Sequence, residues 1–269
     1  MRVKKQNNNI DAIKRNAGRY DNIESTKRYL EGIAGTSHRA ARHKKEYDAV
    51  SQFLQHPYVP IGNTVLDIGC SGGRYIQLFI TNGFRPCGVD TSMTALRYAD
   101  SLFGQNAVFS KASVTHLPFK EDVFDIVLCV ELLHHFDDCY LEKILGEISY
   151  LIKPGGTLIC DVRNSLNPVL WHSYRKRDGR HFTLKTRSIF KMVKILKKCG
   201  FEVLYKKSLF FPISIFAPYV ILFCKYGQDK KVLDTDVCHV VEEDSGIACG
   251  GDEGCTTEGV SAMFIRDVR

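Results

Sequence analysis

Short apolar runs that alternate with amphipathic segments begin at Asn63, and they constrain the fold more than any other feature of the chain. The runs are rich in Val, Ile, Leu and Phe, and most of the segments between them carry apolar residues at helical spacing. Such alternation predicts a parallel sheet that is covered by helices on both faces. The expected strands are 64–69, 85–90, 106–113, 125–130, 155–162, 201–207 and 218–226, and the expected helices are 40–54, 75–82, 93–103, 140–151 and 188–199.

The two ends of the chain differ from this central part in composition. The first part is polar and mostly helical in pattern, and its apolar residues at helical spacing are expected to dock rather than to bind a ligand. Those docking residues are Tyr47, Val50, Phe53 and Leu54. The last part is acidic and glycine-rich, although the whole chain has a net charge of +7. The expected organisation is a helical segment at 1–58, an α/β domain at 59–227 and an acidic tail at 228–269.

The sequence VLDIGCSGGRY at residues 65–75 is the most informative local feature, because an apolar strand there enters a turn of small residues and then a helix. Small residues let the backbone approach a ligand closely, and the N–H groups at a helix N-terminus suit a polar or anionic ligand. Gly69, Ser71 and Gly73 are spaced every second residue, unlike the G-x-G-x-x-G pattern of dinucleotide-binding domains. The turn lies at the carboxyl end of a strand, where sheets of this kind bind their ligands.

The next expected strand ends in GVDTS, which places Asp90 about twenty residues after the glycine turn. A carboxylate at this position can accept hydrogen bonds from both hydroxyls of a ribose. The alternative interpretation is that this acidic residue only caps the following helix. The order of the two features favours the first interpretation.

Four motifs in order resemble those of class I S-adenosylmethionine-dependent methyltransferases, of the group that recurs in small-molecule methylating enzymes. The matching sequences are VLDIGCSGGRY, GVDTS, LPF with FDIVLCVELLHHF, and LIKPGGTLIC, and the resemblance covers residues 64–226. It implies a doubly wound, mostly parallel seven-stranded sheet with a Rossmann-like topology. It also implies S-adenosyl-L-methionine as the cofactor and methyl transfer as the activity.

The resemblance implies a cofactor-binding role for particular positions, namely Asp67, Gly69, Ser71, Gly73, Asp90, Thr91, Met93, Ser113 and Val130. Asp67 would lie beside the methionine part of the cofactor, Asp90 would bind the ribose, and Val130 would face the methyl-donor region. Two positions depart from the family pattern. Ser71 replaces the usual glycine, and Ser113 replaces an aspartate that often contacts the adenine amine.

Methyl transfer from a sulfonium requires in-line approach of a nucleophile, and a base is needed only if the acceptor must lose a proton. The candidates for such a base are His134 and His135, with His172 and His181 in the following stretch. Asp161, at the end of a strand, is equally placed to contact the acceptor. The sequence does not choose among them.

The acceptor is expected to meet the stretch 162–186, which is too long for an ordinary connection in a compact domain. Its aromatic residues Trp171, Tyr174 and Phe182 favour a small organic, lipophilic acceptor. Its basic residues instead favour RNA, and they are Arg175, Lys176, Arg177, Arg180, Lys185 and Arg187. A third hypothesis is a catalytically silent scaffold of the same fold. The lack of an Asn-Pro-Pro-Tyr or Asp-Pro-Pro-Tyr motif after the fourth strand disfavours DNA adenine and protein glutamine acceptors.

Three further features bear on location and on metals. The uncharged stretch 208–224 is too short and too proline-rich for a spanning helix, so it predicts two buried strands joined by a loop. The alternative is that this stretch forms an apolar rim over a lipophilic pocket and makes peripheral contact with a membrane. Cysteines within apolar runs and a first segment without an apolar core predict a cytoplasmic protein. The cysteines and His239 of the tail match no compact zinc spacing, so we expect no metal site.

Overall fold

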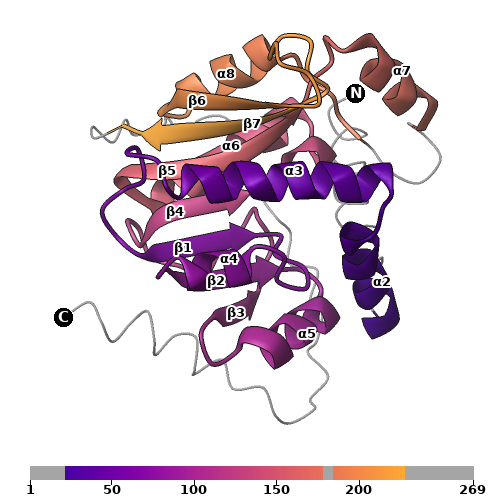
Figure 1. The fold of residues 1–269 in the computed structure, drawn as a ribbon. Coiled ribbons are helices and arrows are strands. Elements are labelled where there is room, and N and C mark those ends of the chain that lie inside the picture. The colour runs from indigo at the N-terminus through magenta and orange to yellow at the C-terminus, as the bar shows by residue number, and fades with distance from the viewer. Residues whose placement is uncertain (1–21, 178–183, 228–269) are drawn as a thin grey trace, which may run out of the picture. The chain divides into compact units, whose positions relative to one another are not determined.

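A computed structural model describes residues 22–177 and 184–227 of the chain, and these form a seven-stranded sheet with helices on both faces (Figure 1). The strand order is β3-β2-β1-β4-β5-β7-β6. The strands are β1 (Thr64–Ile68), β2 (Arg85–Asp90), β3 (Val108–Lys111), β4 (Phe124–Cys129), β5 (Ile152–Arg163), β6 (Phe201–Leu209) and β7 (Tyr219–Tyr226). β7 is antiparallel to both neighbours, and the other pairs are parallel. The predicted doubly wound, mostly parallel seven-stranded sheet is therefore confirmed.

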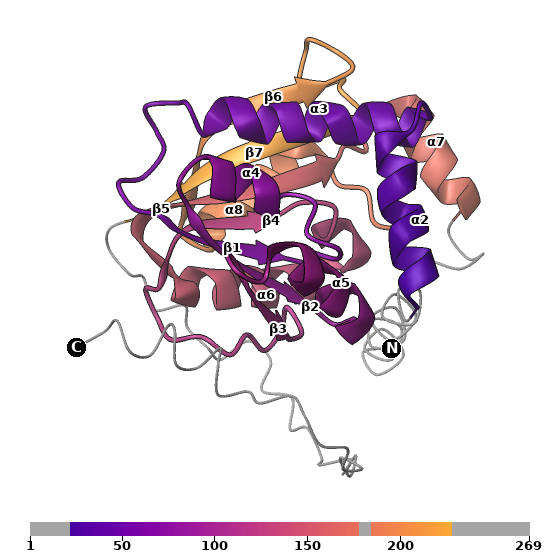
Figure 2. The same cartoon turned by 60° about the horizontal axis from the view of Figure 1, so that its bottom comes forward.

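Helices connect most of the strands and cover the sheet. They are α2 (Ile23–Ala34), α3 (His38–Phe53), α4 (Ile76–Thr81), α5 (Met93–Phe103), α6 (Asp138–Leu151), α7 (Pro168–Arg177) and α8 (Ile189–Lys198). Figures 1 and 2 show α3, α4 and α5 on one face of the sheet and α6 and α8 on the other. Serine side chains start three helices, because Ser37, Ser92 and Ser188 each accept a hydrogen bond from the backbone three residues later.

The expected docking face near the N-terminus exists and lies on α3. Val50 and Phe53 are fully buried, and Leu54 follows them into the same hydrophobic cluster as Phe223 of β7. The rings of Phe53 and Phe223 stack with their centroids 4.3 Å apart. Tyr47 packs at the edge of the cluster, where its ring stacks 6.0 Å from that of Tyr75. The α3 helix is therefore part of the same hydrophobic core as the sheet.

The stretch 208–224 was expected to form two buried strands joined by a loop, but only its second half forms a buried strand. β7 is buried from Tyr219 to Cys224, whereas β6 contributes only its last two residues to the stretch. The residues between the two strands form a loop that exposes several large apolar side chains. The prediction is thus wrong for the first half of the stretch, because Phe210 has a φ of 67° and Pro212 has no N–H for a strand ladder.

Two expectations concern stretches of the chain that the structure describes only in part or not at all. The stretch 162–186 contains α7, so it is not merely a loop, and residues 178–183 lie outside the described residues. The tail 228–269 lies outside them as well. Within the part of the chain that the structure describes, no helix has the length and apolarity that a membrane span requires. Seven cysteines of this part carry free thiols.

The packing of α3 gives a first prediction. Replacing the buried Phe53 by alanine leaves a cavity against Phe223, so we expect Phe53→Ala to lower the free energy of unfolding by about 3–5 kcal/mol. Urea unfolding followed by circular dichroism measures the change. The matched control is Ile61→Ala, because Ile61 is fully exposed. Equal stability of the two variants would contradict the docked position of α3.

Candidate active site

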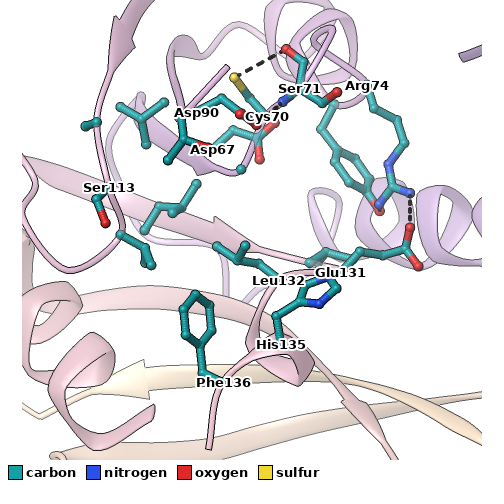
Figure 3. Close-up of a pocket in the computed structure, with 18 of the residues that line it drawn as sticks. Asp67, Cys70, Ser71, Arg74, Asp90, Ser113, Glu131, Leu132, His135 and Phe136 are labelled. Atoms are coloured by element: carbon teal, nitrogen blue, oxygen red, sulfur yellow. Dashed lines mark hydrogen bonds and ion pairs between the residues drawn. The ribbon is translucent and has the colours of Figure 1, made fainter. Parts of the chain in front are cut away.

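A pocket opens at the carboxyl ends of β1, β2 and β4, the edge at which the glycine turn was expected to act (Figure 3). Its lining residues come from four parts of the chain: α2, the turn after β1, the end of β2 with the turn after β3, and the turn after β4. They are Tyr29, Asp67, Ile68, Gly69, Cys70, Ser71, Arg74, Tyr75, Val89, Asp90, Thr91, Ala112, Ser113, Val114, Val130, Glu131, Leu132, His135 and Phe136. The motifs that are distant in sequence thus meet in one place.

The turn after β1 holds a backbone conformation that suits small residues. Gly69 has a φ of 78°, and its N–H donates to the carbonyl of Val89 at 2.8 Å. Ser71 has a φ of 48°, a left-handed conformation that costs a non-glycine residue energy. The backbone N–H of Ser71 donates to Asp90 Oδ2 at 3.0 Å, which helps to hold the turn in this shape.

Asp67 is buried at the end of β1, and its Oδ2 atom has no hydrogen-bond partner among the described residues. Burial raises the pKa of its carboxyl to about 7; Arg74 opposes this shift and Asp90 adds to it. Ser71 Oγ is likewise buried without a partner. Buried polar atoms are normally satisfied, so these two orphaned atoms in a pocket wall fit a polar ligand. The positive charges of the amine and the sulfonium of S-adenosylmethionine are complementary to the negative charge of the Asp67 carboxylate.

Asp90 combines a structural contact with a place in the pocket wall. Its Oδ2 accepts from the N–H of Ser71, and its Oδ1 accepts from the N–H of Ser92 at 2.9 Å. Burial raises its pKa, and the hydrogen bonds from Ser92, Ser71 and Thr91 partly oppose this. Because each carboxylate oxygen has two acceptor sites, both oxygens can still accept from ribose hydroxyls. The cap of α5 is Ser92 rather than Asp90, so the structure does not support the alternative that Asp90 only caps the helix.

Most of the residues that the resemblance assigns to the cofactor line this pocket. Those that line it are Asp67, Gly69, Ser71, Asp90, Thr91, Ser113 and Val130. Gly73 and Met93 are not among the lining residues. Gly73 has a φ of 85°, and a Cβ there would lie 2.8 Å from the ring of Phe103, so its small size serves the packing of the turn against α5.

The three residues that were expected to contact the acceptor or to act as the base do not all line the pocket. His135 lines the pocket, whereas His134 and Asp161 do not. Burial lowers the pKa of His134 well below its usual range, and the adjacent His135 adds to this effect. Asp161 is buried, and its Oδ1 accepts from the N–H of Glu131 at 2.7 Å. Its geometry is that of a residue that positions the turn after β4. His172 is exposed on α7, and His181 lies outside the described residues.

Glu131 is the main site residue that the sequence reasoning missed. It lies two residues after the end of β4, has a φ of 66°, and lines the pocket. Its carboxylate forms ion pairs with Arg42, Arg74 and Arg163. Burial alone would raise the pKa of Glu131, but Arg163, Arg42 and Arg74 hold it well below its usual range. The available signal was a charged residue directly after the expected strand 125–130.

The same cluster includes a set of atoms that resembles a metal site. His43, Glu46 and Glu131 offer ligand atoms that all lie within 4.8 Å of one another. However, Arg74 contacts all three of these residues. Because guanidinium groups already balance these carboxylates, the arrangement is a buried ion-pair network, in which a bound cation would meet positive charge.

The α2 helix closes one side of the site. Tyr29 of α2 lines the pocket, and a Cβ on Gly72 would lie 2.7 Å from Leu30 Cδ1. The helix therefore packs directly on the glycine turn. No motif in the sequence indicates this contact, because α2 is about forty residues from the turn and joins it only in the folded chain.

Comparisons with known proteins agree with this geometry. A family model for methyltransferase domains matches residues 66–160. An uncharacterized protein of Methanocaldococcus jannaschii is 32% identical over 62% of this chain and 70% of its own length. A tRNA U34 carboxymethyltransferase of Campylobacter curvus is 29% identical over 55% of this chain, which spans about half (52%) of that relative.

Among solved structures, magnesium protoporphyrin IX methyltransferase from Synechocystis PCC 6803 superposes with a TM-score of 0.59. The match covers 74% of this chain and 93% of that one at 18% identity, so it shows a shared fold and nothing about activity. The family match falls on the segment that builds most of the pocket wall, and the sheet is the mostly parallel, seven-stranded one that the resemblance implies. The chain therefore belongs to the class I S-adenosylmethionine-dependent methyltransferases.

Proposed function

We propose that the protein transfers a methyl group from S-adenosylmethionine to a small organic acceptor of lipophilic character. The observation that carries the proposal is the division of the pocket into two unlike ends (Figure 3). Asp67 and Asp90 supply carboxylates at one end. Phe136 supplies an apolar ring at the other, and Leu132 lies between the two ends (Figure 3). A charged, polar cofactor suits the first end, and an apolar acceptor suits the second.

The proposed roles follow from chemistry and position. Asp67 pairs with the amine of the methionine part, and Asp90 accepts from the ribose hydroxyls. Thr91 and Ser113 lie at the adenine side, and Val130 lies at the methyl-donor side. When bound, S-adenosylmethionine supplies a methyl group activated by the positive sulfonium. The protein's own contribution is to orient the two reactants and to exclude water.

His135 is the base that we propose for an acceptor that must lose a proton. It lines the pocket, and its ring centroid lies 4.2 Å from that of His134. The buried His134 is held in its neutral form by the lowered pKa, so it adds no positive charge beside His135. A neutral imidazole can accept a proton, which is the property that a general base needs.

RNA remains the second candidate acceptor, because one relative bears the name of a tRNA U34 carboxymethyltransferase. The basic stretch supports it less than the sequence suggested. The side chain of Arg187 is engaged within the protein, since it donates to Asp138 and to the carbonyls of Leu133 and Phe136. The side chains of Arg175, Lys176, Arg177 and Arg180 lie outside the described residues.

One labelling experiment separates the hypotheses. The protein is incubated with methyl-labelled S-adenosylmethionine and a cell extract, which is then divided into organic-soluble, aqueous small-molecule, RNA and protein fractions. We expect the label in the organic-soluble fraction. Label in RNA would favour the second candidate. Cofactor binding without label in any fraction would favour the silent scaffold.

A substitution at Asp90 tests the cofactor site. We expect Asp90→Asn to weaken S-adenosylmethionine binding by about 10- to 100-fold, because a charged hydrogen-bond acceptor is lost. Isothermal calorimetry measures the affinity, and a thermal melt verifies the fold, since Asp90 also holds the N–H groups of Ser71 and Ser92. Asp100→Asn on the exposed side of α5 is the control. Unchanged affinity in a folded Asp90→Asn protein would overturn the ribose assignment.

The raised pKa of Asp67 predicts a pH dependence of cofactor affinity. The cationic cofactor favours the ionised carboxylate, so affinity rises as the pH approaches about 7 and levels off above it. Below this pH, binding releases a proton, because the bound cofactor lowers the pKa of the carboxyl. Calorimetry in two buffers with different ionisation enthalpies detects this proton. Asp67→Asn should bind weakly and without proton release, whereas a pH-independent affinity of the wild type would contradict the role.

A further inference from the structure

Large apolar side chains gather on two segments that the methyltransferase site does not use. The connection from β6 to β7 exposes Phe210, Phe211, Ile213 and Phe216, of which Ile213 is 54% exposed and Phe216 51%. The segment 166–171, which enters α7, exposes Leu166, Val169 and Trp171, and Val169 is 76% exposed. We call these seven side chains the apolar patch. Contiguous exposed apolar surface in a folded protein marks an interaction site.

Hydrogen bonds hold the two segments of the patch together. The buried Asn164 donates from Nδ2 to the carbonyls of Ile215 at 2.9 Å and Ala217 at 3.0 Å. Asn167 donates from Nδ2 to the carbonyl of Phe216 at 2.9 Å. Two asparagine side chains thus fix the backbone that presents the apolar side chains. The patch is a preformed surface, so little ordering is needed when it binds.

Helix α3 adds positive charge beside the patch. Phe210 adopts a φ of 67°, and its ring stacks on that of His38, with centroids 5.3 Å apart. The Nζ atom of Lys45 lies 5.3 Å from the centre of the same ring. A cationic side chain therefore stands next to the apolar side chains, on the face of the sheet that α3 covers.

The segments that build the patch contain no acidic residue. Neither 162–177 nor 203–228 holds an Asp or a Glu, although acidic residues are frequent elsewhere in the chain. An apolar centre with basic neighbours and no acidic residues complements a surface that combines hydrocarbon with negative headgroups.

We propose that the apolar patch docks the protein on an anionic phospholipid surface. Phe211, Ile213 and Val169 enter the boundary between headgroups and acyl chains, while Lys45 meets a headgroup phosphate. The two most exposed members of the patch, Val169 and Ile213, are aliphatic and offer no face for stacking on RNA bases, which favours lipid over RNA as the occupant. A second copy of the chain would bring a second Lys45 to the same surface, which disfavours self-association.

The patch lies at the same edge of the sheet as the pocket. Arg163 at the carboxyl end of β5 pairs with Tyr219, so the connection from β6 to β7 stands at that edge. Docking therefore turns the edge that holds the pocket towards the lipid. This orientation suits the lipophilic acceptor of the proposed function, but lipid binding itself does not depend on that function.

Flotation of the full-length protein with vesicles tests the proposal. We expect binding to vesicles of phosphatidylcholine with phosphatidylserine, and at least about tenfold weaker binding to phosphatidylcholine alone. The double substitution Phe211→Ser with Ile213→Ser should reduce binding about tenfold or more, and Lys45→Glu should weaken the preference for phosphatidylserine. The matched control is Phe190→Ser, because Phe190 is 63% exposed on α8, outside the patch.

Several outcomes would overturn the proposal. One is the absence of wild-type binding to phosphatidylserine vesicles, and another is undiminished binding of the Phe211→Ser, Ile213→Ser protein. Binding of a single-stranded RNA that this variant loses would assign the patch to RNA instead. A dimer in sedimentation experiments that the variant abolishes would assign it to self-association. Unchanged S-adenosylmethionine affinity and thermal melting of the variants show that the fold and the cofactor site are intact, so failure here leaves the proposed function standing.

Discussion

The buried ion-pair network around Glu131 is the interaction on which the rest of the site depends. It joins helix α3 through Arg42, the turn after β1 through Arg74, and the end of β5 through Arg163. Asp161 holds the backbone of Glu131 at the same time. Removing one partner from a buried network costs about 3–5 kcal/mol, because the remaining charges are left uncompensated. The network therefore sets the distance between the N-terminal helices and the pocket wall.

The pocket also contains groups that work against the stability of the protein without ligand. Burial of Asp67 raises its pKa to about 7, so its charged form is disfavoured at the pH where a cationic ligand needs it. Because the folded-state pKa lies above the unfolded value, the contribution of this carboxyl to stability falls as the pH rises towards 7. Ser71 and Glu131 add left-handed backbone at the same site. A cofactor that satisfies these groups would stabilise the folded protein.

Much of the site could be read from the sequence because it lies at strand ends. Asp67, Gly69 and Asp90 lie at the ends of apolar strands, and parallel strands bring their carboxyl ends to one edge. The alternation of strands and helices and the helix at Met93–Phe103 followed from periodicity, and the family resemblance implied the seven-stranded sheet. The expectation of a buried strand in the first half of 208–224 was wrong, because an apolar run alone does not show whether it forms a strand or an exposed loop. His134 and His135 are neighbours in sequence and their rings lie side by side, yet only His135 lines the pocket, because His134 is buried behind it.

The sequence alone determined the order of strands and helices, the glycine turn and the acidic strand ends, because these depend on local pattern and on spacing along the chain. The tertiary structure decided which distant residues join them. Only in the folded chain does Tyr29 line the pocket, does Arg42 pair with Glu131, and does Asn164 bond to the loop before β7. The physical reason is that such contacts depend on how helices and loops pack, and packing couples residues whose separation in sequence carries no signal.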